Sequence, residues 1–226
     1  MRNFYIIIAV VAVTGGGVLL HAMRGGGGAA VEPVELGELE QQELIDLARP
    51  AGVHGDPDAP VTIMEFADYQ CGACKQFGLF VKPQVDLAYI ETGQAKLVFH
   101  DFPILSLHAN AFVAARAARC AGDQDSYFEY HDRVFHTQED WAPLSSAIRH
   151  FKDLAEELGL DAQAFGDCLE SDRHADVVTA NMRLGERLGV TGTPAIFVHR
   201  GGPPLVRLGG FQLLDVREAV EGGGEN

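Results

Sequence analysis

The sequence is poor in positive charge. Its 226 residues include 17 Lys and Arg against 32 Asp and Glu, and the formal net charge is -15. Nucleic-acid-binding proteins concentrate Lys and Arg on the surface that meets the phosphate backbone, and this chain has too few for such a surface. We therefore expect no nucleic-acid partner. The chain also lacks an internal repeat, and its length suits one domain with an insertion better than two domains.

The segment Phe4–Met23 lacks Asp, Glu, Lys and Arg altogether. It is close to the roughly 20 apolar residues that a helix needs to cross a bilayer. The only sequence after it that suits a signal peptidase, Gly28-Ala29-Ala30, lies well downstream. We therefore favour an uncleaved membrane anchor over residues 1–24, with a cleaved signal peptide as the alternative. Either reading exports the rest of the chain to the periplasm or the outer cell face.

The order of the remaining elements predicts an α/β fold. Residues 25–49 begin Gly-rich and continue acidic, which indicates a linker with one short helix. Strands are expected at 61–67, 95–99, 195–199 and 205–208, and helices at 71–90 (bent at Pro83), 109–120, 126–136, 145–158, 162–169, in a stretch ending at 188, and at 213–220. This order predicts a thioredoxin-like sheet over residues 50–220, with an all-helical insertion at about 104–188 and a tail at 221–226.

The Cys71-Gly72-Ala73-Cys74 motif carries the predicted chemistry. Cys71 follows a buried strand by four residues and opens a helix, so its sulfur faces unpaired backbone N–H groups. Those groups favour thiolate over thiol, which makes Cys71 the attacking sulfur. Cys74 lies one turn further on the same helix face, where it can close a disulfide or resolve a mixed one.

Two other uses of the CxxC spacing are less favoured. A zinc site needs two more ligands, but Cys120 and Cys168 stand alone, and the nine histidines are scattered without a ligand pair beside either. We therefore predict no metal site, and no cofactor. A purely structural Cys71–Cys74 disulfide would close too short a loop to restrain much chain entropy.

Three segments together resemble the DsbA-type thiol:disulfide oxidoreductases: EFADYQCGACKQF (65–77), FHDFP (99–103) and GVTGTP (189–194). The resemblance covers roughly residues 50–220. It implies that Pro194 is cis and lies beside the CxxC motif, where the backbone of Thr193 pairs with an extended substrate chain. One departure is that many relatives carry proline and an aromatic residue or histidine between the cysteines, whereas this chain has Gly72 and Ala73.

Glu65 is expected on the strand beneath the helix, buried close to Cys74. A buried carboxyl group has a raised pKa and can accept the proton of the resolving thiol. The resemblance supports this proton-relay role, because the family carries an acid at the matching place. The alternative is a solvent-facing residue at a strand end.

Cys120 and Cys168 are predicted to form a structural disulfide, because an exported chain is oxidised after it leaves the cytoplasm. A second relay pair and two free thiols remain as alternatives. Two further groups are placed by the sequence: His100, His108, His131 and His136 at the surface or on helices, and Tyr127, Phe128, Tyr130 and Trp141 in the insertion core.

The predicted function is an exported enzyme that forms disulfides in client proteins containing cysteines, and that a membrane redox partner resets. Reduction or isomerisation of disulfides is the runner-up. A binding module without redox turnover and a metal-delivery protein are the rivals from other classes, and loss of activity in Cys71→Ser would separate the enzyme from both.

Overall fold

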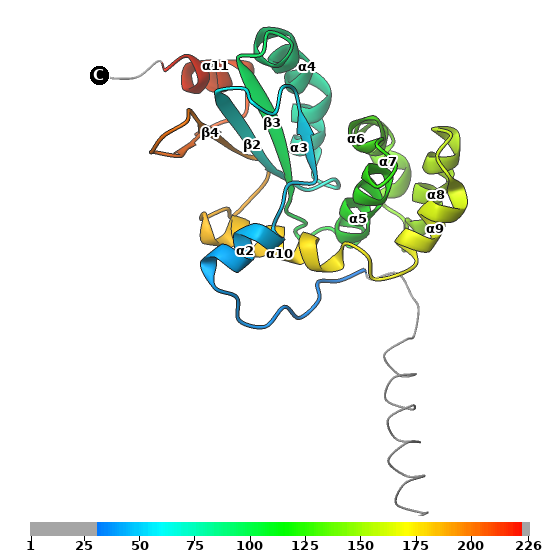
Figure 1. The fold of residues 1–226 in the computed structure, drawn as a ribbon. Helices are drawn as coiled ribbons and strands as arrows, with labels where there is room; N and C mark the ends of the chain where they lie inside the picture. Colours follow the sequence, from blue (N-terminus) through cyan, green and yellow to red (C-terminus); the bar gives the residue numbers. More distant parts are fainter. Residues whose placement is uncertain (1–30, 223–226) are drawn as a thin grey trace, which may run out of the picture.

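The computed structural model describes residues 31–222, and a five-stranded sheet lies at its centre (Figure 1). The strands, in the spatial order β1-β3-β2-β4-β5, are β1 (Gly52–His54), β3 (Ala95–Asp101), β2 (Val61–Ala67), β4 (Ala195–His199) and β5 (Val206–Arg207). Only β2 and β3 pair in parallel, and the other neighbours are antiparallel. A parallel pair needs a long crossover, and the helical segment that begins with the CxxC motif supplies it.

The strands β2, just before the CxxC motif, and β4, just after Pro194, have the predicted bounds. β2 and β4 are rich in β-branched and aromatic residues, and both are largely buried. β3 extends two residues beyond the predicted end, to Asp101. β1 was not predicted, because three residues carry too little pattern, and it is held by antiparallel pairing with β3.

The helices are α2 (Gln41–Leu47), α3 (Gly72–Gln76), η1 (Phe77–Val81), α4 (Lys82–Val85), η2 (Asp86–Ile90), α5 (Ala111–Gly122), α6 (Tyr127–His136), α7 (Gln138–Trp141), α8 (Ile148–Glu157), α9 (Ala162–Leu169), α10 (Ala175–Arg187) and α11 (Leu213–Glu221). The helix predicted at 71–90 is one helical segment with π turns, η1 and η2, on either side of α4. Pro83 stands in the first turn of α4 and has no N–H to donate to the preceding turn.

The sheet separates two apolar layers (Figure 1). Side chains alternate along a strand, so Ile63 and Glu65 of β2 point to one face and Phe66 to the other. On the first face, Ile63 packs in a cluster with Val85 of α4 and Val216 of α11. On the second face, Phe66 and Phe197 pack with residues of α10. The CxxC helix and Glu65 therefore share one face of the sheet.

The helices α5 to α9 form a separate group beside the sheet (Figure 1). Their buried side chains, including Tyr130, Trp141 and Phe165, belong to one cluster that also takes in Tyr69 and Cys74 from the CxxC segment. The helical group is therefore in contact with the redox motif.

The segment predicted as a linker at residues 25–49 contains the expected short helix, α2, but its described part is packed on the folded body. The side chains of Leu44 and Ala48 are 1% exposed and pack against Ala180 of α10. The Val34 N–H also donates to the Thr179 hydroxyl at 3.1 Å. Burial of the apolar residues of α2 makes this segment part of the folded body.

The predicted anchor, Phe4–Met23, lies outside the described residues. Within residues 31–222, no helix combines the length and apolar character needed to cross a membrane.

Candidate active site

The two cysteines of the CxxC motif differ sharply in exposure. Cys71 is the N-cap of α3, with extended backbone angles, and its sulfur is partly exposed. Its N–H donates to the Asp68 carbonyl oxygen at 3.0 Å, which closes the turn between β2 and the helix. Cys74 lies inside the first turn of α3 and is fully buried. Only Cys71 can therefore meet another protein.

The surroundings of Cys71 favour its thiolate. They lower its pKa from 9.0 to about 5, through the contact with the Cys74 thiol first, and then through the Thr193 hydroxyl and the N–H groups of Cys74 and Ala73, against the opposing effect of burial. The buried Thr193 Oγ1 atom has no hydrogen-bond partner in the reduced structure, so its hydroxyl is free to donate to the Cys71 thiolate. As a thiol, Cys71 donates from Sγ to the Thr193 carbonyl oxygen at 3.5 Å.

The surroundings of Cys74 favour its protonated thiol. Burial raises its pKa well above 9.0, and the contact with Cys71 and the charges of Cys71 and Glu65 raise it further. The Asp68 N–H, which donates to Cys74 Sγ at 3.5 Å, opposes these effects in part. At neutral pH the reduced pair therefore consists of one thiolate and one thiol.

Glu65 lies on β2, and its side chain is buried beneath the CxxC helix. The residue is 1% exposed, and neither carboxylate oxygen has a hydrogen-bond partner. Burial raises its pKa from 4.5 to about 8, Lys82 opposes the rise, and the Cys71 charge adds to it. A carboxyl group with this pKa can both take up and release a proton near neutral pH.

The loop before β4 supplies the other wall of the site. The Thr193–Pro194 peptide bond is cis, and the Thr193 carbonyl oxygen faces Cys71 Sγ. The structure thus brings Cys71, Cys74, Thr193 and Pro194 together at one end of β2 and β4, where Phe66 pairs with Ala195.

Cys120 of α5 and Cys168 of α9 form a disulfide, with 5.9 Å between their Cα atoms. Among the described residues, the only group with metal-ligand proximity is this pair with His174. Both sulfurs are already bonded to each other, so neither is a thiolate ligand. The bridge joins two helices of the insertion and is buried.

Several residues of the site were missed by the sequence reasoning. The Gln138 amide of α7 donates to the carbonyl oxygens of Tyr69 at 2.7 Å and Cys71 at 3.1 Å, and so ties the helical group to the turn before α3. Asp68 is buried in that turn and faces His108 at 2.7 Å. An aspartate directly before a CxxC turn is a signal that sequence reasoning could have used, whereas Gln138 offers none.

Two of the histidines expected at the surface or on helices are placed differently. His100 is buried on β3 and stacks on Phe66, and burial lowers its pKa to about 4. His108 lies in the loop after β3, partly buried against Asp68. Apolar neighbours and a carboxylate partner explain these positions, and neither is visible in the local sequence.

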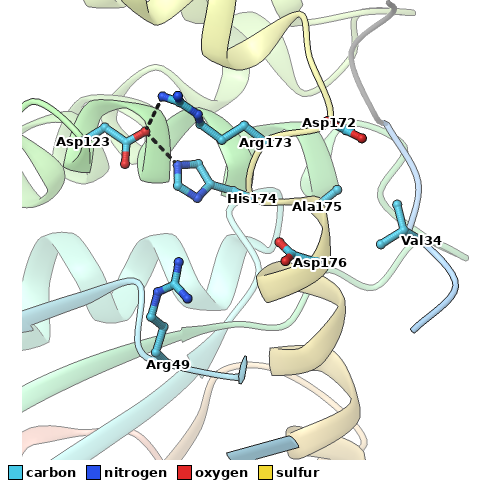
Figure 2. A pocket seen from close by; sticks show the side chains of 8 residues that line it. All are labelled: Val34, Arg49, Asp123, Asp172, Arg173, His174, Ala175 and Asp176. Carbon is cyan, nitrogen blue, oxygen red and sulfur yellow. Dashed lines mark hydrogen bonds and ion pairs between the residues drawn. The ribbon is translucent and has the colours of Figure 1, made fainter. Parts of the chain in front are cut away.

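A pocket of about 790 Å³ lies away from this site (Figure 2). Figure 2 shows Asp123 Oδ2 between Arg173 and His174, at 3.1 Å and 3.0 Å, and the guanidinium of Arg49 across the pocket. None of the predicted redox residues lines it.

Comparison with known proteins agrees with this geometry. The family model described as "Thioredoxin" matches residues 49–200. The crystal structure of Wolbachia pipientis alpha-DsbA1 aligns with a TM-score of 0.67 and 26% identity, over 75% of this chain and 88% of that one. This chain belongs to the DsbA-like thioredoxin family. Its members include thiol:disulfide oxidoreductases, and the chain is an enzyme of that kind.

The fraction of its own length over which a relative matches this chain differs between two further relatives. The "Probable disulfide bond formation protein D" of Bacillus anthracis is 28% identical over 149 residues, 64% of this chain and 68% of its own length. A "Na(+)/H(+) antiporter NhaA 3" of Salinispora tropica is 30% identical over 161 residues, but these cover 23% of its length. The match is therefore to a minor part of that antiporter, and transport is not carried over to this DsbA-like chain.

Proposed function

We propose that this DsbA-like enzyme forms disulfide bonds in exported proteins through Cys71 and Cys74. The observation that carries the proposal is the stabilised Cys71 thiolate, which faces the helix N–H groups and the Thr193 hydroxyl. A protein that stabilises its thiolate stabilises its reduced state and is therefore an oxidant. Oxidation of clients thus fits the site better than reduction does.

The oxidation proceeds in two exchanges. A client thiolate attacks Cys71 Sγ of the oxidised enzyme, the Cys71–Cys74 bond breaks, and Cys74 leaves as a thiolate that takes the proton of Glu65. A second client thiolate then attacks the client sulfur of the mixed disulfide, and Cys71 leaves as a stable thiolate. The client loses two electrons and the enzyme gains them. Thr193 and Pro194 hold the client chain in extended form during both steps.

Resetting the enzyme requires the reverse proton movement. The Cys71 thiolate attacks a disulfide of a membrane redox partner, and Cys74 must then lose its proton to resolve the mixed disulfide. Glu65 shares a face of the sheet with the CxxC helix, and its charge and that of Cys74 influence each other. The carboxylate is the base that accepts this proton.

Export and anchoring belong to the same proposal. The Phe4–Met23 segment would anchor the enzyme to the membrane or direct its export. The buried Cys120–Cys168 disulfide supports an oxidising compartment, because such bonds persist outside the cytoplasm. Fractionation and intact mass of the native protein test the anchor, and a soluble mature chain that begins near Val31 would contradict it.

The direction of electron flow is tested by equilibrium of the full chain with glutathione. We expect a potential clearly less negative than thioredoxin's roughly -270 mV. A potential near that value, with an ordinary Cys71 titration, would favour the reductase.

The division of labour between the cysteines is tested by trapping. Cys74→Ser should accumulate mixed disulfides with clients through Cys71, because no resolving thiol remains. Cys71→Ser is the matched control and should accumulate none. Adducts formed through Cys74 in that control would reverse the assignment.

A further inference from the structure

The loop that follows β3 is fastened to the CxxC turn by one buried side chain, that of Asp68. Its carboxylate accepts the Gln70 N–H at 2.7 Å and the Ile104 N–H at 2.7 Å, and its Oδ2 lies 2.7 Å from His108 Nδ1. The main chain of the same residue binds both cysteines, accepting from the Cys71 N–H and donating to Cys74 Sγ. Asp68 therefore links His108 to the redox pair through a single residue.

The CxxC helix brings no free positive side chain to Cys71. Gly72 and Ala73 stand between the cysteines, and the next residue, Lys75, is paired with Glu139 at 2.6 Å. Glu65, on the sheet beneath, adds negative charge near Cys71 once it ionises. A side-chain cation that adds to the hydrogen bonds on the Cys71 thiolate must therefore come from outside α3.

His108 meets this requirement. Its side chain is 21% exposed and lies 2.7 Å from Asp68, the residue whose main chain binds both cysteines. The hydrogen bond to Asp68 raises the pKa of His108 above 6.5, the Asp68 and Cys71 charges add to this, and partial burial opposes it. The contact with Asp68 does not depend on the redox state of the pair, whereas the Cys71 charge is lost when the disulfide forms.

We propose that His108 is a positioning residue. Held by its contact with Asp68, it supplies a positive charge that stabilises the Cys71 thiolate. The proposal rests on Cys71 and Cys74 being the redox pair and deepens the proposed function, but it holds for either direction of electron flow. The imidazolium favours the reduced enzyme over the oxidised enzyme, and so adds to the oxidising strength of the pair.

Coupling between two charges is reciprocal. If the imidazolium stabilises the thiolate, then the thiolate stabilises the imidazolium equally, and oxidation of the pair must lower the His108 titration midpoint. A histidine that only fastens the loop would keep one midpoint, because its contact with Asp68 does not involve the redox pair. The two roles are therefore separable in the unmodified protein.

The first experiment is an NMR titration of the His108 ring in the full chain, oxidised and then reduced. We expect a midpoint at least about 0.5 pH unit higher in the reduced enzyme, as for opposite charges that interact near a surface. Equal midpoints in the two states would overturn the proposal. His136, exposed on α6, is the internal control and should not respond.

The second experiment titrates the Cys71 thiolate by its ultraviolet absorbance in three variants. His108→Gln keeps a hydrogen-bond donor for Asp68 and removes the charge, and should raise the Cys71 midpoint by at least about 0.5 pH unit. His108→Lys restores a charge and should return the midpoint most of the way. His136→Gln should leave it unchanged.

An unchanged Cys71 midpoint in folded His108→Gln would also overturn the proposal. If the variant fails to fold, the NMR titration of the unmodified protein still decides. Neither titration requires client turnover, so a chain that forms no mixed disulfides in Cys74→Ser would refute the proposed function and leave the His108 result standing on its own.

Discussion

Replacing Glu65 by glutamine should make the stability of this protein less dependent on pH. The Glu65 carboxyl group is fully buried, both of its oxygens lack hydrogen-bond partners, and its pKa is raised from 4.5 to about 8. Because the folded state holds this proton more tightly than the unfolded state, the stability it contributes is present below pH 4.5 and is lost as pH rises through about 8.

The size of the effect follows from the same two values. At about 1.4 kcal/mol for each pKa unit, the gap between 4.5 and about 8 corresponds to a loss of up to about 5 kcal/mol across that pH range. Glutamine does not ionise, so the variant escapes this loss. The amide that replaces the carboxyl group is also buried without hydrogen-bond partners, which lowers the free energy of unfolding by about 1–3 kcal/mol at every pH.

The measurement is urea unfolding of oxidised wild-type protein and Glu65→Gln at a series of pH values. In the oxidised protein Cys71 carries no charge, so the smallest contribution to the Glu65 pKa is absent and burial, the largest one, remains. The stability difference between the two proteins should move in favour of the variant by several kcal/mol between pH 4.5 and 8. Glu91→Gln removes an exposed carboxyl group and is the control. A difference that stays constant with pH would refute the account of Glu65 as a buried, proton-holding group.

Two further predictions concern the stability of the helical group and its junction with the sheet. Replacing both Cys120 and Cys168 with alanine should lower the free energy of unfolding by roughly 4 kcal/mol, because the disulfide closes a long loop. Calorimetry against the oxidised wild type measures this loss. An unchanged unfolding midpoint would mean that the disulfide restrains the unfolded chain little. Arg119→Met should cost about 3–5 kcal/mol at neutral pH, because it leaves the buried Asp101 without its 2.6 Å partner. Adding Asp101→Asn should recover much of this loss, and full additivity of the two substitutions would contradict the pairing.

The sequence predicted those elements that carry their pattern locally. β2 and β4 are apolar, β-branched segments bounded by turn residues, and their observed limits are the predicted ones. The alternation along β2 also placed Glu65 on the face beneath the CxxC helix, which is where the structure has it. β1 could not be predicted, because its three residues are a strand only through their pairing with β3, whose residues lie more than 40 positions later.

The composition of the segment before β1 predicts a linker with one short helix, and the helix is present as α2 but packed rather than free. Its acidic and Gly-rich character is typical of a linker, but Leu44 and Ala48 of the α2 region fit against α10, which is distant in the sequence. Apolar residues in an otherwise polar stretch are a signal of packing only when their partner is known. The irregular helix after Cys74 was also only partly predicted, since Pro83 indicates a disturbance but not the π turns on either side of α4.

The chemistry of the redox pair was also only partly predictable from the sequence. The position of Cys71 at a helix N-terminus, readable from the sequence, accounts for the N–H groups that favour its thiolate. The remaining contributions come from residues that only the fold brings close. Thr193 is 122 residues from Cys71 in the sequence, and His108 is 40 residues from its partner Asp68. Gly72 and Ala73 offer no side-chain charge, so a reading limited to the motif predicts a weaker oxidant than relatives with a histidine there. If the loop after β3 supplies that charge, the oxidising strength of this enzyme cannot be ranked from the two residues between its cysteines alone.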